Sequence, residues 1–179
     1  MKLLIVRHGE TDENSQKIIQ GRLPGKLTSL GEKQAKELGK KLKKYKIDKI
    51  YCSPIDRCRQ TLELALKEMD YKGEIEYTEL LSERDFGKYS GKPRSEVDFD
   101  ELDKDTAENK DMGVETQGNI DRRIKEFLEK IRQKDNQTVL VVSHSNPIRC
   151  LWVNLTSKSF REVLETVSIE NGEIEEFLF

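Results

Sequence analysis

The stretch KLLIVRHGETDEN occupies residues 2–14, and its first half decides the fold. The apolar run from Leu3 to Val6 is too short for a membrane span or for the apolar part of a signal peptide. It suits a strand that is buried on both faces. Arg7 and His8 follow the run directly. Ligands of open α/β sheets bind beyond the carboxyl ends of the strands, so we expect these two side chains at a binding crevice.

A second run of this kind lies near the other end of the chain. Residues 138–143 read TVLVVS, a continuous apolar and β-branched stretch, and His144 follows it. His8 and His144 are the only two histidines in the sequence. If the two strands are neighbours in a parallel sheet, both imidazoles project into one crevice.

The rest of the chain alternates between short apolar runs and amphipathic segments. Strands are predicted for 47–52 and 74–78, and helices for 29–45, from an N-cap at Ser53 with Pro54 in the first turn, for 120–131, and from Asn146-Pro147. A hairpin is predicted for 167–174, around Asn171-Gly172. The fold class is therefore α/β: a three-layer α/β/α sandwich with a largely parallel central sheet and an antiparallel edge strand.

A length of 179 residues fits a single domain spanning 1–179. Within it, residues 84–118 are poor in apolar side chains and are interrupted by glycines and a proline, which predicts a loop or lid with one short helix. Residues 98–111 hold seven Asp or Glu against two Lys, a local charge of −5. We expect this acidic run to be solvated.

Composition excludes several classes of partner. The net charge of −2 and the pI of about 5.9 give no general attraction to nucleic acid or to an anionic membrane. Three cysteines without CxxC spacing suit reduced thiols in a cytoplasmic protein. The scattered histidines and cysteines lack metal-ligand spacing, so we expect no metal and no cofactor. The expected oligomeric state is a monomer or homodimer.

Five side chains at or near predicted strand ends suggest one chemistry: Arg7, His8, Arg57, Glu83 and His144. Arginine presents a planar fork of donors that matches phosphate oxygens. A neutral imidazole can act as a nucleophile, and a carboxyl group can protonate a departing alkoxide. Phosphoryl transfer requires alignment, positive charge and a nucleophile, and these residues supply all three without a metal.

The motifs resemble those of the histidine phosphatase superfamily, the phosphoglycerate mutase-like proteins. The resemblance covers nearly the whole chain and is carried in order by Arg7 to Asn14, Gln20-Gly21, Cys52 to Thr61, Glu83 to Gly87, and Val142 to Asn146. It implies that His8 becomes phosphorylated, that Arg7, Arg57 and His144 hold the phosphoryl group, and that Glu83 is the general acid and then the base. It also implies that Asn14, Gln20, Gly21 and Ser145 line the substrate pocket.

Two departures from the family pattern bear on function. Ser145 stands where the family usually has glycine, and the paired basic lid residues of the mutases are not evident in the acidic segment. We therefore expect a metal-independent phosphatase that acts on small phosphorylated substrates. The alternative is a phosphoglycerate mutase-type enzyme that returns the phosphoryl group to a bound intermediate. A non-catalytic phospho-ligand binding module is disfavoured, because such modules normally lose a histidine or the Glu.

Overall fold

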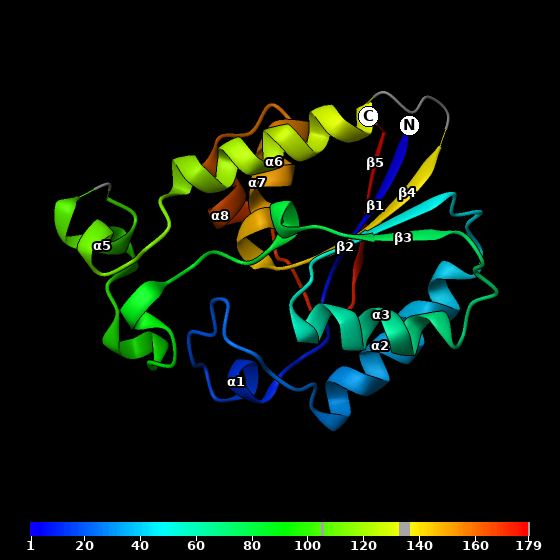
Figure 1. Cartoon of the computed structure of the whole chain (residues 1–179), viewed down its shortest axis with the longest axis horizontal. Helices are drawn as coiled ribbons and strands as arrows, with labels where there is room; N and C mark the ends of the chain where they lie inside the picture. Colours follow the sequence, from blue (N-terminus) through cyan, green and yellow to red (C-terminus); the bar gives the residue numbers. More distant parts are fainter. Residues whose placement is uncertain (105, 133–136, 179) are drawn as a thin grey trace.

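The structure is a computed structural model, and it describes residues 1–104, 106–132 and 137–178. Its centre is a five-stranded sheet in the order β3-β2-β4-β1-β5 (Figure 1). The strands are β1 (Lys2–Arg7), β2 (Lys49–Cys52), β3 (Glu74–Tyr77), β4 (Thr138–Ser143) and β5 (Ile174–Leu178). Four of them are parallel, and β5 runs antiparallel to β1 at one edge. The predicted sheet and its antiparallel edge are confirmed.

The two central strands bury alternate residues on opposite faces, which produces the three layers. Leu3 and Ile5 of β1 pack into one apolar cluster, whereas Leu4 and Val6 pack into another. Successive strand side chains point to opposite sides, so a continuous apolar run needs a cover on both faces. In β1 and β4, the residues that need this cover are the apolar runs 3–6 and 138–143.

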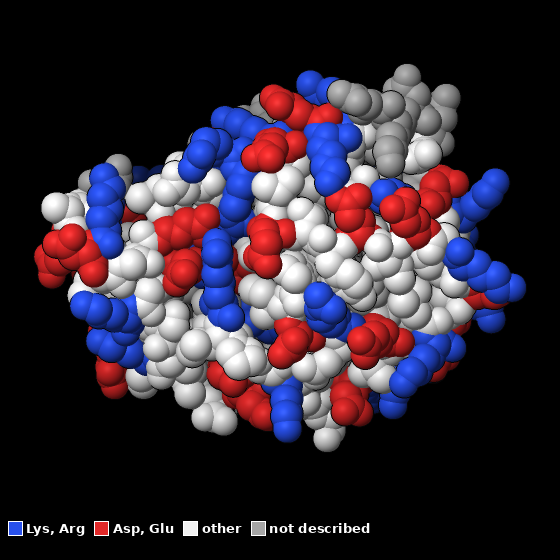
Figure 2. Space-filling model, viewed as in Figure 1, with Lys and Arg blue, Asp and Glu red and all other residues white. Residues whose placement is uncertain are grey.

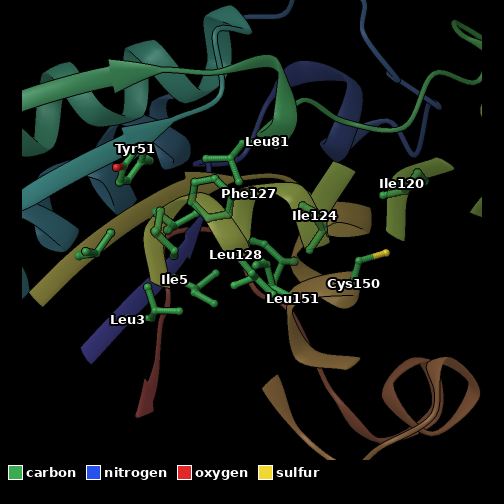
Figure 3. Packing of buried hydrophobic residues seen from close by; sticks show 14 of the residues in the cluster. Leu3, Ile5, Tyr51, Leu81, Ile120, Ile124, Phe127, Leu128, Cys150 and Leu151 are labelled. Atoms are coloured by element: carbon green, nitrogen blue, oxygen red, sulfur yellow. The ribbon is translucent and has the colours of Figure 1, made fainter. Parts of the chain in front are cut away.

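One face is covered by α6 (Gln117–Arg132) and α7 (Ser145–Leu155). Ile120, Ile124, Phe127, Leu128 and Ile131 form the buried stripe of α6. Phe127 meets the ring of Tyr51 edge-on, with the centroids 5.3 Å apart (Figure 3). This packing fixes α6 and α7 against the strands whose ends carry the polar residues.

The opposite face is covered by α2 (Ser29–Leu42) and α3 (Asp56–Leu66). The two helices touch closely at Gly39, where an added Cβ would lie 2.3 Å from the carbonyl oxygen of Ala65. Leu38 and Leu42 of α2 and Leu62 of α3 fill the space above the sheet. Since α3 is seated in this way, Arg57 in its first turn points toward the carboxyl edge of the sheet.

The segment predicted as a loop with one short helix contains more structure than expected. It holds the 3-10 turns η2 (Gly87–Tyr89) and η3 (Arg94–Glu96) and the helices α4 (Phe99–Leu102) and α5 (Ala107–Asp111). Ile19, Phe86, Leu102 and Val114 form a small apolar cluster beneath it. In Figure 1 this segment and α1 (Asp12–Ser15) lie to the left of the sheet. The short helices escaped detection because four or five residues carry no helical periodicity.

The predicted N-cap at Ser53 is wrong, since α3 begins at Asp56 with Ile55 as its N-cap. The backbone N–H of Ser53 still donates to the Val142 carbonyl at 2.9 Å, which holds this residue on the sheet. Likewise, α7 begins at Ser145, with His144 as its N-cap. Neither capping position has a side-chain hydrogen bond to the helix.

The predicted C-terminal hairpin is also wrong, because residues 167–170 form no strand. Instead the Arg7 guanidinium donates to the Ile169 carbonyl at 2.8 Å, and the Gly172 N–H donates to the Arg7 carbonyl at 3.0 Å. These contacts carry the chain across the end of β1 before it turns into β5. The preceding helix α8 (Phe160–Thr166), capped by Ser159, was not predicted.

No helix in the described ranges is long and apolar enough to cross a bilayer. Figure 2 shows Lys and Arg side chains interspersed with Asp and Glu over the visible face. The cavity described next is lined by both basic and acidic side chains.

Candidate active site

A cavity of about 490 Å³ lies where β1 ends and α3 and α7 begin. Eight of the nine residues predicted for the site line it: Arg7, His8, Asn14, Gln20, Gly21, Arg57, Glu83 and Ser145. The ninth, His144, is fully buried behind Arg57 and is not part of the lining. The fold thus collects residues that are up to 138 positions apart in the sequence.

His8 is held in one tautomer by its neighbours. Its Nδ1 lies 2.8 Å from the carbonyl oxygen of Gly9, which can only accept, so Nδ1 carries the proton. Its Nε2 lies 3.1 Å from Nε of Arg57, which can only donate, so Nε2 has a free lone pair. The ring is 3% exposed and lines the cavity. An imidazole with an unprotonated nitrogen facing a cavity can act as a nucleophile.

Arg57 joins the two histidines. Its Nε–H is shared between Nε2 of His8 and Nδ1 of His144, both at 3.1 Å. Its two terminal nitrogens donate to the carbonyls of Gly21 at 2.7 Å and Leu23 at 3.1 Å. Arg57 is therefore a fixed positive charge that also pins the loop carrying Gly21.

His144 lies in a different environment from the one we expected. Because Arg57 donates to Nδ1, the proton of His144 is on Nε2, which donates to the Ser53 hydroxyl at 2.7 Å. Cys58 Sγ lies 3.4 Å from the same nitrogen, and burial raises the pKa of this thiol to about 12. In this tautomer His144 supports Arg57 and has no proton to offer a phosphoryl oxygen.

Glu83 is oriented by the start of α7. Its Oε1 accepts from the backbone N–H of Arg84 at 2.8 Å, from that of Asn146 at 3.2 Å, and from the Asn146 side chain at 3.1 Å. In the described part of the chain no group donates to Oε2. Of the two carboxyl oxygens, one is thus fixed by hydrogen bonds and the other is not.

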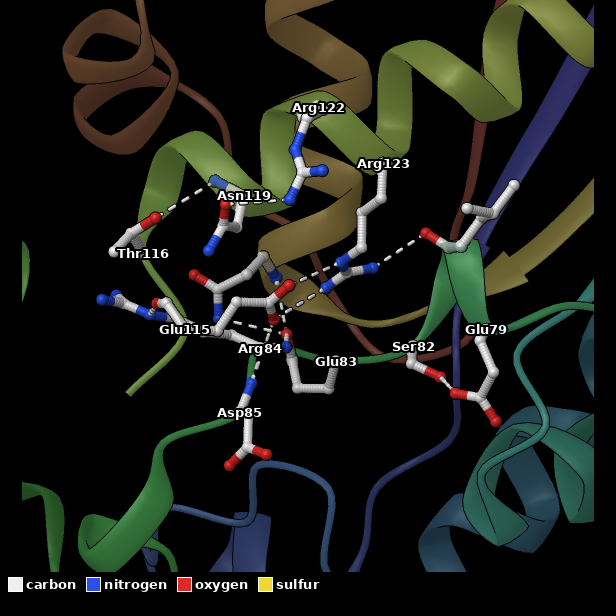
Figure 4. A network of polar contacts seen from close by, with 12 residues as sticks. Glu79, Ser82, Glu83, Arg84, Asp85, Glu115, Thr116, Asn119, Arg122 and Arg123 are labelled. Carbon is white, nitrogen blue, oxygen red and sulfur yellow. Dashed lines mark hydrogen bonds and ion pairs between the residues drawn. The ribbon is translucent and has the colours of Figure 1, made fainter. Parts of the chain in front are cut away.

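A polar network holds the backbone around Glu83 (Figure 4). The carboxylate of Glu115 accepts from Arg123 at 2.9 Å, from Arg22 at 3.3 Å and from the Asp85 N–H at 3.2 Å. Arg84 is 2% exposed and is paired with Asp103. Arg22 and Arg84 are both tied into this network.

Asn14, Gln20 and Gly21 lie along one wall of the cavity. Asn14 accepts from the Thr11 N–H at 3.3 Å, as part of the capping box of α1. Gln20 donates to Glu13 at 2.9 Å and accepts from the Thr11 hydroxyl at 3.1 Å. Gly21 has a φ of 53°, a conformation that favours glycine, and presents its carbonyl to Arg57.

Besides Arg84, three cations that were not predicted line the cavity: Lys17, Arg94 and Arg149. Lys17 and Arg94 come from separate loops that meet where the Arg94 N–H donates to the Lys17 carbonyl at 2.9 Å. No sequence signal brings these loops together. For Arg149 the sequence did hold a signal, because this residue lies one helical turn after Ser145 and therefore on the same face of α7.

Burial sets the protonation of both imidazoles. It lowers the pKa of His8 and of His144 well below 6.5, and the charges of Arg57 and Arg7 lower both further. Both rings are therefore neutral near pH 7, which keeps the Nε2 lone pair of His8 available.

These shifts predict how stability depends on pH. Both folded-state pKa values are depressed, so this contribution is complete above about pH 6.5 and is lost as the pH falls. Between about pH 6 and 5, the free energy of unfolding should fall by up to about 1.4 kcal/mol per pH unit for each histidine. Urea unfolding across this range measures the slope. His144→Asn should remove about half of this slope. An unchanged slope would contradict the attribution of the pH dependence to the two buried histidines.

The chain is similar to one known protein family along nearly its whole length. The family model of the histidine phosphatase superfamily (branch 1) matches residues 3–179. Phosphoserine phosphatase 1 of Hydrogenobacter thermophilus is 35% identical over 163 residues, which cover 87% of this chain and 76% of that protein. A 2,3-bisphosphoglycerate-dependent phosphoglycerate mutase of Nitrobacter winogradskyi is 29% identical over 184 residues, with 90% and 84% covered.

The fold is shared with a solved phosphoglycerate mutase from Bacillus anthracis, with a TM-score of 0.82 at 24% identity over 98% of this chain and 86% of that one. The family thus contains both enzyme types that the motifs suggested. Since the family model matches nearly the whole length, the chain belongs to the histidine phosphatase superfamily.

Proposed function

We propose that the protein is a metal-independent phosphatase that hydrolyses small phosphomonoesters through a phosphohistidine on His8. The observation that carries the proposal is the pair of hydrogen bonds on the His8 ring, from Nδ1 to Gly9 and from Arg57 to Nε2. They leave the nucleophilic nitrogen unprotonated in the cavity and next to a fixed positive charge. Arg7 adds a second guanidinium to the cavity wall.

In the first step, Nε2 of His8 bonds to phosphorus while the ester P–O bond breaks. The phosphoryl group replaces the hydrogen bond between Arg57 and Nε2, so this N–H becomes available to a phosphoryl oxygen. Oε2 of Glu83 gives its proton to the departing alkoxide. The Gly9 carbonyl accepts from Nδ1 throughout and stabilises the positive charge on the phosphorylated ring.

In the second step, the Glu83 carboxylate takes a proton from water as the water oxygen bonds to phosphorus. The P–N bond breaks, inorganic phosphate leaves, and Glu83 is protonated again. Asn146 keeps Oε1 fixed, so the same oxygen of Glu83 serves both proton transfers.

Hydrolysis is favoured over the mutase reaction by the acidic segment. Asp100 and Asp103 line the cavity, and residues 98–111 carry a local charge of −5. A mutase must retain a bisphosphate, whose several negative charges would face Asp100, whereas Asp103 is paired with Arg84. Phosphoserine phosphatase 1, at 35% identity, is a relative with hydrolytic activity in its name. We propose that residues 84–118 act as a lid over the site of a single-domain cytoplasmic enzyme.

The test is hydrolysis of p-nitrophenyl phosphate in EDTA, run beside 3-phosphoglycerate with and without 2,3-bisphosphoglycerate. Nitrophenol release in EDTA without formation of 2-phosphoglycerate supports the phosphatase. Bisphosphate-dependent formation of 2-phosphoglycerate with little hydrolysis would assign the protein to the mutases instead.

Glu83→Gln tests the proton transfer. The amide keeps the contact to the Asn146 N–H but cannot protonate an alkoxide, so esters with poor leaving groups should lose roughly 10²- to 10⁴-fold in kcat. Phosphorylation by p-nitrophenyl phosphate needs no proton, so its burst phase should change far less. Equal losses for an alkyl phosphate and for this burst would argue against an acid role.

A further inference from the structure

Glu115 is a nearly buried carboxylate that pairs with two arginines outside the cavity. Its side chain is 12% exposed, and its Oε1 accepts from Nε of Arg123 at 2.9 Å (Figure 4). Its Oε2 accepts from a terminal nitrogen of Arg123 and from one of Arg22, both at 3.3 Å. The two-point pairing with Arg123 fixes the plane of the carboxylate. Neither Glu115 nor Arg123 is among the described residues that line the cavity, so any effect of Glu115 on the reaction passes through its neighbours.

These neighbours include the backbone on either side of Glu83. Residues 82–85 belong to no helix or strand, so hydrogen bonds from other segments hold them in place. The Asp85 N–H donates to Oε2 of Glu115 at 3.2 Å, and the Glu115 N–H donates back to the Asp85 carbonyl at 2.8 Å. Arg22 binds the Glu115 carboxylate and, through its Nε, the Glu83 carbonyl at 3.2 Å. Glu115 thus holds this backbone both directly and through Arg22.

The same backbone orients the Glu83 carboxyl group. The peptide N–H of Arg84, which lies between Glu83 and Asp85, donates to Oε1 of Glu83 at 2.8 Å. This bond depends on the orientation of a single peptide plane, so a shift of Asp85 would weaken it and let the carboxyl group turn. Proton transfer needs a donor and acceptor within about 2.6–3.2 Å, and a misplacement of about 1 Å is enough to slow it strongly.

We propose that Glu115 is a positioning residue for Glu83, because it holds the backbone from which the Glu83 carboxyl group reaches the leaving oxygen. This inference rests on the role of Glu83 in the proposed function. A carboxylate that only stabilised the fold would, when removed, lower the melting temperature and slow every substrate alike. A positioning residue slows the step that uses the Glu83 proton and spares a step that does not.

Glu115→Gln keeps the size of the side chain but replaces one acceptor oxygen with an NH₂ group. We expect kcat for glycerol 3-phosphate, an alkyl ester, to fall roughly 10- to 100-fold. The burst phase with p-nitrophenyl phosphate needs no proton and should change by less than about threefold. Stopped-flow and steady-state assays measure the two effects. Equal losses in both assays would overturn the proposal.

Arg22→Gln tests the same arrangement with less risk to the fold, because the Arg22 side chain is 42% exposed. It removes the donor to the Glu83 carbonyl and leaves the pair of Glu115 and Arg123 intact. We expect the same selective loss on glycerol 3-phosphate at about 3- to 10-fold, the range of one hydrogen bond. If Glu115→Gln does not fold, the absence of a selective loss in Arg22→Gln overturns the proposal.

Glu76→Gln on β3 is the matched control. The Glu76 carboxylate also pairs with two cations, Lys49 at 3.2 Å and Lys130, but it is not among the residues that line the cavity. Its loss should lower the melting temperature and change both rates by less than about threefold. A selective loss on glycerol 3-phosphate in this variant as well would show that the effect does not depend on contact with residues 83–85, and the proposal would fall.

A double variant shows whether Glu115 acts through Glu83. In the Glu83→Gln background the proton is already missing, so adding Glu115→Gln should lower kcat for glycerol 3-phosphate by less than about threefold. A further loss as large as that in the single variant would mean that Glu115 acts independently of Glu83 and would overturn the proposal.

Amide hydrogen exchange makes the outcome independent of turnover. Glu115→Gln should speed exchange at Arg84 and Asp85 by roughly tenfold, the value of about one hydrogen bond, whereas Glu76→Gln should not. If the wild type hydrolyses no ester but exchange rises in this way, the proposed function fails and the positioning of Glu83 by Glu115 stands. If Glu83→Gln loses alkyl ester turnover selectively but Glu115→Gln does not, the positioning inference fails alone.

Discussion

His8→Ala is expected to lower kcat by about 10⁴- to 10⁶-fold, the scale on which removal of a catalytic nucleophile acts. At 1.36 kcal/mol per factor of ten, this is about 5 to 8 kcal/mol of transition-state stabilisation. The loss is so large because no other described residue offers an unprotonated nitrogen to the cavity. Steady-state hydrolysis of p-nitrophenyl phosphate measures it.

The fold should survive this change. Among the described residues, the His8 side chain hydrogen-bonds to the Gly9 carbonyl and to Arg57, and its backbone stays paired with Ser143. Far-UV circular dichroism and the melting curve should resemble those of the wild type near pH 7. A folded variant that retains substantial turnover would remove His8 from the mechanism.

Arg57→Ala is expected to cost roughly 3 to 4 kcal/mol of transition-state stabilisation, or about 10²- to 10³-fold in kcat, as for a lost oxyanion donor. The same change removes the donors to Gly21 and Leu23 and leaves the Nδ1 lone pair of His144 unpaired. We therefore also expect a lower melting temperature. The loss in kcat should be larger than the unfolded fraction of the variant at the assay temperature can explain.

Arg59→Ala is the matched control, two residues along α3. Arg59 donates to the Pro54 carbonyl at 2.7 Å and lies over the Tyr77 ring, away from the cavity lining. It should change kcat by less than about threefold, within the usual range of surface substitutions. If both variants were equally slow, the loss could not be assigned to contact with the phosphoryl group.

The fold was predictable wherever apolar patterning was continuous. The run from Leu3 to Val6 and the run 138–143 could only be strands covered on both faces, and helices with a buried stripe had to supply the covers. The histidines were found because strand ends meet at one edge of a parallel sheet. Position along the sheet, rather than residue type, made them candidates.

The wrong predictions of an N-cap at Ser53 and of a hairpin at Asn171-Gly172 have a common physical cause, which is competition from tertiary contacts. Ser53 has the chemistry of an N-cap, but its backbone is held on the sheet and its hydroxyl binds His144. Asn171-Gly172 has the chemistry of a hairpin turn, but the Asn171 side chain donates to the His8 carbonyl at 2.7 Å. In both places a residue that locally favours one structure is engaged by the site.

The cavity-lining cations Lys17 and Arg94 escaped prediction from the sequence for another reason. Lys17 and Arg94 lie in segments joined by backbone hydrogen bonds between residues more than 70 positions apart, and lysines and arginines are common over the whole chain. Only the three-dimensional structure distinguishes an arginine that lines the cavity from one that is paired at the surface. This is why these cations were not anticipated from the sequence, whereas the phosphoryl site was.

The central claim is tested most directly by identifying the phosphorylated residue. Wild type and Glu83→Gln would be mixed with p-nitrophenyl phosphate, quenched rapidly in alkali, which preserves phosphohistidine, and digested for mass spectrometry. We predict one added phosphoryl group on the peptide that contains His8, with greater occupancy in Glu83→Gln because its second step lacks a base. Turnover with no phosphoryl group on His8 in either protein, or with the group on another residue, would contradict the account.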